Sequence, residues 1–239
     1  MSATAVAAIE VRDLRFRWPG AQTDCLDIAE FVVAPGEAVF LHGPSGSGKS
    51  TLLNLLGGVV LPQAGMVRLL GRDLTGLAGA ARDRLRADHL GFIFQQFNLV
   101  PYLPVLDNVL LATRFSARRR DAATAAHGSP AAAARALLDG LEVGGALAGQ
   151  RADTLSVGQQ QRVAAARALI GAPDVVIADE PTSALDEDLR QAFLTLLTAR
   201  CRAHGTALVF VSHDRRMAAA FDRTVALADI NRQPRGAGA

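Results

Sequence analysis

Residues 43–50, which read G-P-S-G-S-G-K-S, have the residue types and spacing of a loop that binds phosphate groups. Its glycines let the backbone curl so that several N–H groups point at phosphate oxygens. Lys49 adds a compact positive charge for the outer phosphates, and the Ser50 hydroxyl is a ligand for Mg²⁺. The residues expected to surround the phosphates are Gly43, Ser45, Gly46, Ser47, Gly48, Lys49, Ser50 and Thr51.

The segments on either side of this loop support the same interpretation. An apolar strand is expected at 38–41, and a helical run at 51–56 leaves the loop with its positive N-terminal end toward the phosphates. Lys49 is the only lysine in the chain, so an ammonium is kept where a compact charge is wanted rather than a planar fork. A chance glycine-rich turn is disfavoured because the motif and its strand–loop–helix context agree.

Polar side chains follow three short apolar runs that are typical of buried strands. In parallel α/β sheets, ligands bind beyond the carboxyl ends of the strands, so these side chains are candidates for the same site. They are Gln95 after 90–94, Asp179 and Glu180 after 175–178, and His213 after 207–211.

Each of these side chains has a distinct expected role. Adjacent carboxylates at a strand end are costly unless their charge is compensated, so Asp179 is expected to reach a Mg²⁺ ion. Glu180 is then placed to accept a proton from an attacking water. Gln95 could touch either the ion or the water, although a plain loop glutamine remains an alternative. An isolated histidine is usually structural, but His213 ends its strand as the others do, which favours contact with a phosphate.

Two further features are ambiguous on spacing alone. Ser156 stands where the N-cap of a helix belongs, leaving N–H groups that could meet an anion, yet most Ser-capped helices bind nothing. Trp18, the only tryptophan, follows Phe16 on the same expected strand face. The alternation favours a core position for Trp18 over stacking on a nucleotide base.

The composition restricts the class of protein. Half of the 239 residues are hydrophobic, and the formal net charge of +2 is too small to argue for a nucleic-acid partner. No apolar stretch is long enough for a membrane span, and the first residues lack the features of a signal peptide. The two cysteines, far apart in sequence, are expected to be buried thiols in a reducing cytoplasm.

The remaining elements are read from periodicity and turn residues. Segment 114–130, with its Arg118–Arg120 run, is expected to be a solvated linker rather than a contact for phospholipid headgroups, and 144–149 a loop. Residues 232–239 are expected to be a frayed tail. Strands are expected at 9–18, 26–33, 66–70 and 225–228, and helices at 77–87, from about 105, at 131–141, at 163–170 and at 188–203.

With these motifs in order, nearly the whole chain resembles the nucleotide-binding subunit of an ATP-binding-cassette (ABC) transporter. Residues 94–99 look like the glutamine loop of that family, and 155–159 look like its signature, usually L-S-G-G-Q. Residues 175–180 resemble the acidic strand motif, 183–186 the loop after it, and His213 the histidine switch. One departure is Val157, where glycine is commonest in the signature.

The resemblance implies an α/β fold with a P-loop NTPase (RecA-like) core, a small antiparallel β subdomain and a helical signature subdomain. It implies a single domain over 1–239, with the core and β layer in 1–94 and 171–239 and the mainly helical part in 95–170. ATP and Mg²⁺ are the implied ligands, with Glu180, His213 and Gln95 catalytic and Ser50, Gln95 and Asp179 at the metal. The resemblance also reverses the interpretation of Trp18, which falls where an adenine-stacking aromatic usually lies. The other implied nucleotide contacts are Ser156, Gly158, Gln159 and Asp186.

The implied function is an ATPase that powers a separate membrane permease from the cytoplasmic face of the inner membrane. Two copies would sandwich ATP between the P-loop of one and the signature of the other. Within the family, the chain looks most like the lipoprotein-releasing and macrolide-exporting group. An ATP-gated scaffold, for example in cell division, is the alternative, while a P-loop kinase is disfavoured because it would carry no signature. No nucleic-acid partner is expected.

Overall fold

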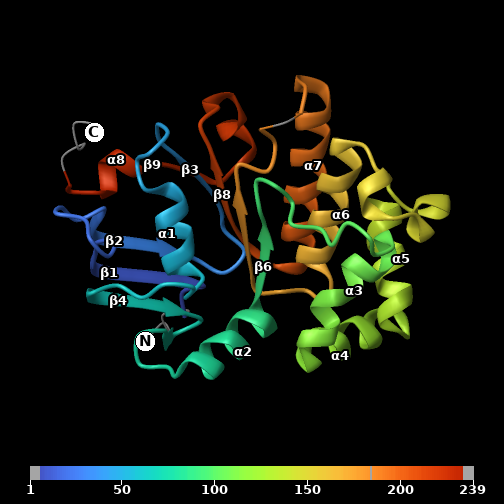
Figure 1. The fold of residues 1–239 in the computed structure, drawn as a ribbon, viewed down its shortest axis with the longest axis horizontal. Coiled ribbons are helices and arrows are strands. Elements are labelled where there is room, and N and C mark those ends of the chain that lie inside the picture. The colour runs from blue at the N-terminus through green and yellow to red at the C-terminus, as the bar shows by residue number, and fades with distance from the viewer. Residues whose placement is uncertain (1–5, 184, 234–239) are drawn as a thin grey trace, which may run out of the picture.

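A five-stranded parallel sheet forms the centre of the molecule in the computed structural model, which describes residues 6–183 and 185–233 (Figure 1). Its strand order is β6-β7-β8-β3-β9, and every neighbouring pair runs parallel. Such strands are covered on both faces and therefore read as continuous apolar runs. The strands are β3 (Ala38–His42), β6 (Leu90–Ile93), β7 (Val175–Asp179), β8 (Ala207–Ser212) and β9 (Arg223–Ala226).

A four-stranded antiparallel sheet with the order β2-β1-β4-β5 lies beside it (Figure 1). Its strands are β1 (Ile9–Phe16), β2 (Leu26–Val33), β4 (Ala64–Leu69) and β5 (Arg72–Asp73). In β1 and β2, buried apolar side chains alternate with more exposed ones, so one face packs inward. Strand β1 ends at Phe16, two residues before the expected end, which leaves Trp18 in the loop that follows.

Helices cover both faces of the parallel sheet and build two hydrophobic cores. Alternate strand residues such as Val39 and Val209 face the core shared with α1 and the antiparallel sheet. Their neighbours Phe40 and Phe210 face the core built with the helices from α3 to α7. The helices are α1 (Lys49–Leu56), α2 (Gly79–His89), α3 (Val105–Phe115), α4 (Ala117–His127), α5 (Pro130–Gly140), α6 (Val157–Leu169), α7 (Glu187–His204) and α8 (Leu227–Ile230). The described part of the chain also contains three 3₁₀ helices: η1 (Gly145–Gly149), η2 (Ala152–Thr154) and η3 (Arg215–Ala220).

The expected solvated linker at 114–130 is wrong, because most of it forms α4. Ser116 caps this helix by accepting a hydrogen bond from the Arg119 backbone, and Gly128 ends it in the left-handed conformation. Arg119 itself is only 3% exposed and donates to the carbonyls of Leu90 and Ile170. The middle arginine of the run is therefore a buried structural residue, whereas Arg120 remains exposed.

Smaller differences concern element ends. The expected strand at 225–228 begins at Arg223 and gives way to α8 at Leu227, and the expected loop at 144–149 contains η1. Residues 1–5, where no signal peptide is expected, and residues 234–239, which make up most of the expected frayed tail, lie outside the described residues. Among the helices described, none is both long enough and apolar enough to span a membrane.

Candidate active site

The P-loop joins the buried strand β3 to α1, and its backbone conformation depends on glycine. Gly48, at the start of α1, has a φ of 98°, which side-chain-bearing residues rarely adopt. A β-carbon at this position would also meet Leu26 Cδ2 at 3.0 Å and Cys25 Sγ at 3.3 Å. The backbone conformation therefore favours glycine here, and a larger residue would also be tightly packed against Leu26 and Cys25.

Lys49 reaches back across the loop from the first position of α1. Its Nζ donates to the Gly43 carbonyl at 2.8 Å and the Pro44 carbonyl at 2.9 Å, and it lies 3.5 Å from Glu180 Oε1. The side chain is 6% exposed, so its charge is held in a mostly buried setting where charge compensation matters.

Two carboxylates come from the carboxyl end of β7. Burial raises the pKa of Asp179, the neighbouring Glu180 charge raises it further, and a hydrogen bond from Ser50 and the charge of Lys49 act against the rise. Glu180 has a left-handed backbone with φ of 42°, and its N–H donates to the Val211 carbonyl at 3.0 Å. Its Oε2 lies 3.2 Å from His213 Nδ1. A strained residue of this kind is typical of functional sites.

A cavity of about 480 Å³ joins most of these groups. It is lined by Trp18, Cys25, Ser45, Gly46, Gly48, Lys49, Ser50, Thr51, Gln95, Asp179 and Glu180. Trp18 is 42% exposed, and its Nε1 donates to Thr51 Oγ1 at 3.3 Å, so the core position favoured by spacing alone is wrong. The ring stands edge-on to buried Phe16 and lies at the mouth of the phosphate-binding loop.

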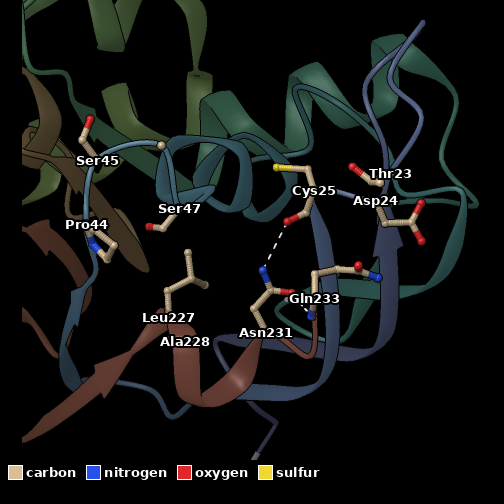
Figure 2. Close-up of a pocket in the computed structure, with 11 residues that line it drawn as sticks. Thr23, Asp24, Cys25, Pro44, Ser45, Ser47, Leu227, Ala228, Asn231 and Gln233 are labelled. Carbon is tan, nitrogen blue, oxygen red and sulfur yellow. Dashed lines mark hydrogen bonds between the residues drawn. The ribbon is translucent and has the colours of Figure 1, made fainter. Parts of the chain in front are cut away.

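A second cavity, of about 670 Å³, also borders the P-loop and shares Cys25, Ser45 and Gly46 with the first (Figure 2). Figure 2 shows Ser45 and Ser47 of the loop on one side of it, with Asn231 and Cys25 joined by a hydrogen bond from the Asn231 amide. Lys49, Asp179 and Glu180 do not line this cavity, so it lacks the charges that phosphate chemistry needs.

Sequence reasoning did not identify Cys25 and Asn231 as residues that line a cavity beside the P-loop. Cys25 is half-buried and borders both cavities, contrary to the expectation of two buried thiols, while Cys201 is buried as expected. The position of Cys25 directly before β2 was the only signal available, and it does not reveal which loop packs against it.

The residues around the P-loop suit a magnesium ion. Ser50, Gln95 and Asp179, which offer a hydroxyl, an amide and one carboxylate as oxygen ligands, all line the same cavity. Among the described residues, no cluster of three or more His, Cys, Asp or Glu side chains forms an all-protein metal cage. Mg²⁺ is usually held by one or two carboxylates together with substrate phosphates, so this set fits it.

The signature residues lie apart from this cavity on the same chain. Ser156 caps α6, with its Oγ accepting from the Gln159 N–H at 3.3 Å and the Gln159 amide oxygen accepting from the Ser156 N–H at 2.9 Å. Val157, the departure from the usual signature, is 46% exposed at the first position of the helix. Asp186 caps α7 by accepting from the Leu189 N–H. Ser156, Gly158, Gln159 and Asp186 are not among the residues that line the cavity containing Lys49.

Comparisons with known proteins identify relatives of this arrangement. Residues 26–183 match the family model described as ABC transporter. An uncharacterized ABC transporter ATP-binding protein, YbbA of Escherichia coli K12, is 45% identical over 198 residues, which is 83% of each chain. The lipoprotein-releasing system ATP-binding protein LolD of Novosphingobium aromaticivorans is 38% identical, covering 92% of this chain and 95% of LolD.

Two further comparisons concern a longer relative and a solved structure. The macrolide export ATP-binding/permease protein MacB of Rhodopseudomonas palustris HaA2 is 38% identical over 94% of this chain and 33% of MacB. The dimeric post-hydrolysis structure of the cassette MJ0796, bound to ADP and phosphate, superposes with a TM-score of 0.78 at 32% identity. It covers 91% of this chain and 93% of that one. The expected α/β P-loop fold with its antiparallel β layer is confirmed.

Proposed function

The chain belongs to the ABC transporter family, and from this premise we propose that it is the ATP-hydrolysing subunit of a complex with a separate membrane permease. The observation that carries the proposal is the meeting of Lys49, Asp179 and Glu180 at one cavity beside the P-loop. A phosphate cradle, a metal-binding carboxylate and a candidate base are the parts that phosphoryl transfer to water requires.

Binding uses the residues at the mouth and floor of the cavity. The exposed Trp18 ring offers a face for the adenine base, and Lys49 with the backbone N–H groups of the loop holds the phosphates. Ser50, Gln95 and Asp179 would hold Mg²⁺, which supplies positive charge at the phosphate oxygens.

In the hydrolytic step, Glu180 accepts a proton from the water whose oxygen bonds to the γ-phosphorus. The bond from that phosphorus to the bridging oxygen breaks, the oxygen remains on ADP, and inorganic phosphate is released. His213 contacts the Glu180 carboxylate at 3.2 Å and thereby fixes which way it points. Lys49 Nζ lies 3.5 Å from the same carboxylate, so it links the P-loop to the strand end that carries Glu180.

A second copy of the chain would complete the site. Ser156 and Gly158 lie away from their own chain's cavity, so the N-terminal end of α6, which carries them, would meet the ATP held by another copy. The dimeric structures of the related MJ0796 cassette support the pairing of two copies, which we propose to be head to tail. ATP is then held between two chains, and its hydrolysis removes contacts that favour the closed dimer.

The surface assigned to the permease is a groove of about 400 Å³ next to the Gln95 loop. Its apolar wall includes Phe94, which is 39% exposed, and Phe115, which is 72% exposed. Large exposed aromatic side chains of this kind mark protein interaction sites. In MacB a single protein is named both ATP-binding and permease, which supports a permease as the partner of a chain that matches only a third of it.

The names of the relatives favour transport over a scaffold role. LolD and MacB are named for lipoprotein release and macrolide export, so we assign this chain to a complex that extracts or exports a substrate. Its place would be peripheral, on the cytoplasmic face of the inner membrane, held there by the permease.

The test is a Glu180→Gln variant mixed with ATP and Mg²⁺. Losing the base is expected to lower ATP hydrolysis by about a hundredfold or more while ATP binding persists. The trapped nucleotide should shift the chain from monomer to dimer in size-exclusion chromatography. Glu142→Gln, which alters an exposed carboxylate paired with Arg162, is the matched control and should behave as the unaltered chain. A Glu180→Gln chain that still turns over ATP, or that stays monomeric, would contradict the proposal.

A further inference from the structure

Arg167, near the carboxyl end of α6, holds the loop that carries Gln95, and we propose that it is a positioning residue for Gln95. It does so by tying this loop to the helix that begins at the signature residue Ser156. The inference rests on the proposed function, in which Gln95 contacts Mg²⁺ or the attacking water.

The loop has a conformation that its residues do not favour by themselves. Phe97 and Asn98 follow one another with φ values of 57° and 49°, both left-handed. Consecutive left-handed residues other than glycine persist only where the surroundings hold them. Within the loop, the Phe97 N–H donates to the Phe94 carbonyl at 2.9 Å, which closes the turn around Gln95 and Gln96.

Arg167 supplies the outside support at the two strained residues. Its Nη2 donates to the Phe97 carbonyl at 2.5 Å and its Nη1 to the Asn98 carbonyl at 2.6 Å. Burial lowers the pKa of this guanidinium. A planar fork that meets two adjacent carbonyls fixes their relative orientation, which a lysine ammonium cannot do as well.

Helix α6, which carries Arg167, is stabilised at both of its ends. Ser156 begins α6 with a capping box, and Arg167 lies eleven positions after it, a span of about 16 Å along the helix. At the carboxyl end, Arg119 of α4 donates to the carbonyls of Ala168 and Ile170. Because Arg167 and Ser156 lie on the same helix, the contacts of Arg167 connect the Gln95 loop to the signature.

The hydrogen bonds from Arg167 to the carbonyls of Phe97 and Asn98 form a clamp on the Gln95 loop. This clamp borders the groove assigned to the permease. Phe94, Asn98 and Arg167 line that groove together. A partner seated there would therefore press on the clamp, and through it on both Gln95 and the signature.

Arg167→Met keeps the aliphatic stem and removes the fork. Backbone amides of residues 94–98 are expected to exchange with solvent about tenfold faster, because the carbonyls of the turn lose their support. The Mg²⁺ concentration that half-saturates ATP hydrolysis is expected to rise about tenfold, since a group that orients a metal ligand typically has that effect. ATP binding measured without Mg²⁺ should stay unchanged.

Arg162→Met is the matched control. Arg162 lies on the same helix and donates to the Leu141 carbonyl and to Glu142, away from the Gln95 loop. It should leave both amide exchange at 94–98 and the Mg²⁺ requirement as they are. Arg167→Lys, which retains the charge, should restore part of the exchange protection and provides the test if Arg167→Met fails to fold.

The outcomes are separable. Unaltered exchange at 94–98 in Arg167→Met would overturn the clamp, and faster exchange with an unaltered Mg²⁺ requirement would overturn its link to Gln95. Failure of the proposed function would appear in the unaltered chain as absence of ATP hydrolysis, whatever the exchange experiment gives.

Discussion

Charge compensation between neighbouring loops organises this protein at the scale of single residues. Lys49 and Glu180 are both largely buried and pair across the cavity, and Glu180 in turn contacts His213. Directly after His213, Asp214 caps η3 and pairs with Arg216 at 2.6 Å and Arg190 at 2.8 Å. The residue that orients Glu180 is thus followed by one that is held by two arginines.

The Asp214 pairing predicts a pH-dependent contribution to stability. Hydrogen bonds from Arg216, aided by the Arg216 and Arg190 charges, lower the pKa of Asp214 to about 2. Because the folded state holds the ionised form more strongly, the stabilisation is present above the ordinary aspartate pKa of about 4 and is lost between about pH 4 and 2.

Asp214→Asn should therefore lower the free energy of unfolding by about 1 kcal/mol near neutral pH, the size typical of partly exposed ion pairs. The difference in free energy of unfolding between the variant and the unaltered chain, measured by urea titration, should become smaller below about pH 4. Asp121→Asn, at an exposed carboxylate on α4, is the control. If this difference in free energy of unfolding stays the same at acidic pH, Asp214 stabilises the fold through packing rather than through its charge.

Val157 gives a second prediction at this scale. Its exposed side chain stands at the first position of α6, between Ser156 and Gly158. Val157→Gly should leave ATP binding to the monomer unchanged and alter the turnover of the dimer, because only the dimer brings the signature to a phosphate. Steady-state hydrolysis at saturating ATP measures this. Unchanged turnover would show that the position tolerates either residue.

At the scale of elements, α6 is held at its carboxyl end by a buried arginine from α4. Arg119 donates to the carbonyls of Leu90, Arg167, Ala168 and Ile170. Burial lowers the pKa of Arg119 to about 10, which leaves it charged in neutral solution. Carbonyls at the end of a helix lack partners within the helix, so a cation that satisfies several of them stabilises that end.

Arg119→Met should be strongly destabilising, by about 3 kcal/mol, because several buried carbonyls lose their hydrogen bonds. Arg120→Met, one residue later and exposed, should change the free energy of unfolding by less than about 0.5 kcal/mol. Chemical denaturation of both variants makes the comparison. Equal effects would show that Arg119 has no special part in holding α6.

The contrast between these two arginines also shows where sequence reasoning ends. The strands that deliver Gln95, Asp179 and His213 were predictable because apolar runs and a parallel sheet fix where their carboxyl ends lie. The burial of Arg119 was not, because its acceptors are carbonyls 29 to 51 residues away in sequence. The left-handed backbone of Glu180 likewise depends on a hydrogen bond to Val211 on the neighbouring strand, and the residue type gives no sign of it.

At the scale of the whole molecule, the separation of the two half-sites predicts complementation between different variants. Lys49→Ala disables the cradle of its own chain, and Gly158→Asp places a negative charge where a partner's phosphate would lie. A β-carbon on Gly158 meets only ordinary contacts with Leu185 and Leu189, so the second variant should fold normally.

Each variant alone should be inactive, because both composite sites of its homodimer contain the defect. In a mixture, half of the composite sites of the mixed dimer combine an intact cradle with an intact signature, so hydrolysis should partly return. Titrating one variant into the other while following phosphate release measures this. A mixture as inactive as its components would contradict head-to-tail pairing.

The presence of a single lysine has a practical consequence for these experiments. Since Lys49 is the only lysine in the chain, a lysine-specific protease has one internal cleavage site, at the nucleotide cradle. With the side chain 6% exposed and bonded to Gly43 and Pro44, that site is shielded in the folded chain. The appearance of two fragments, of 49 and 190 residues, would therefore time the opening of the cradle itself, and any nucleotide that occupies it should delay the cut.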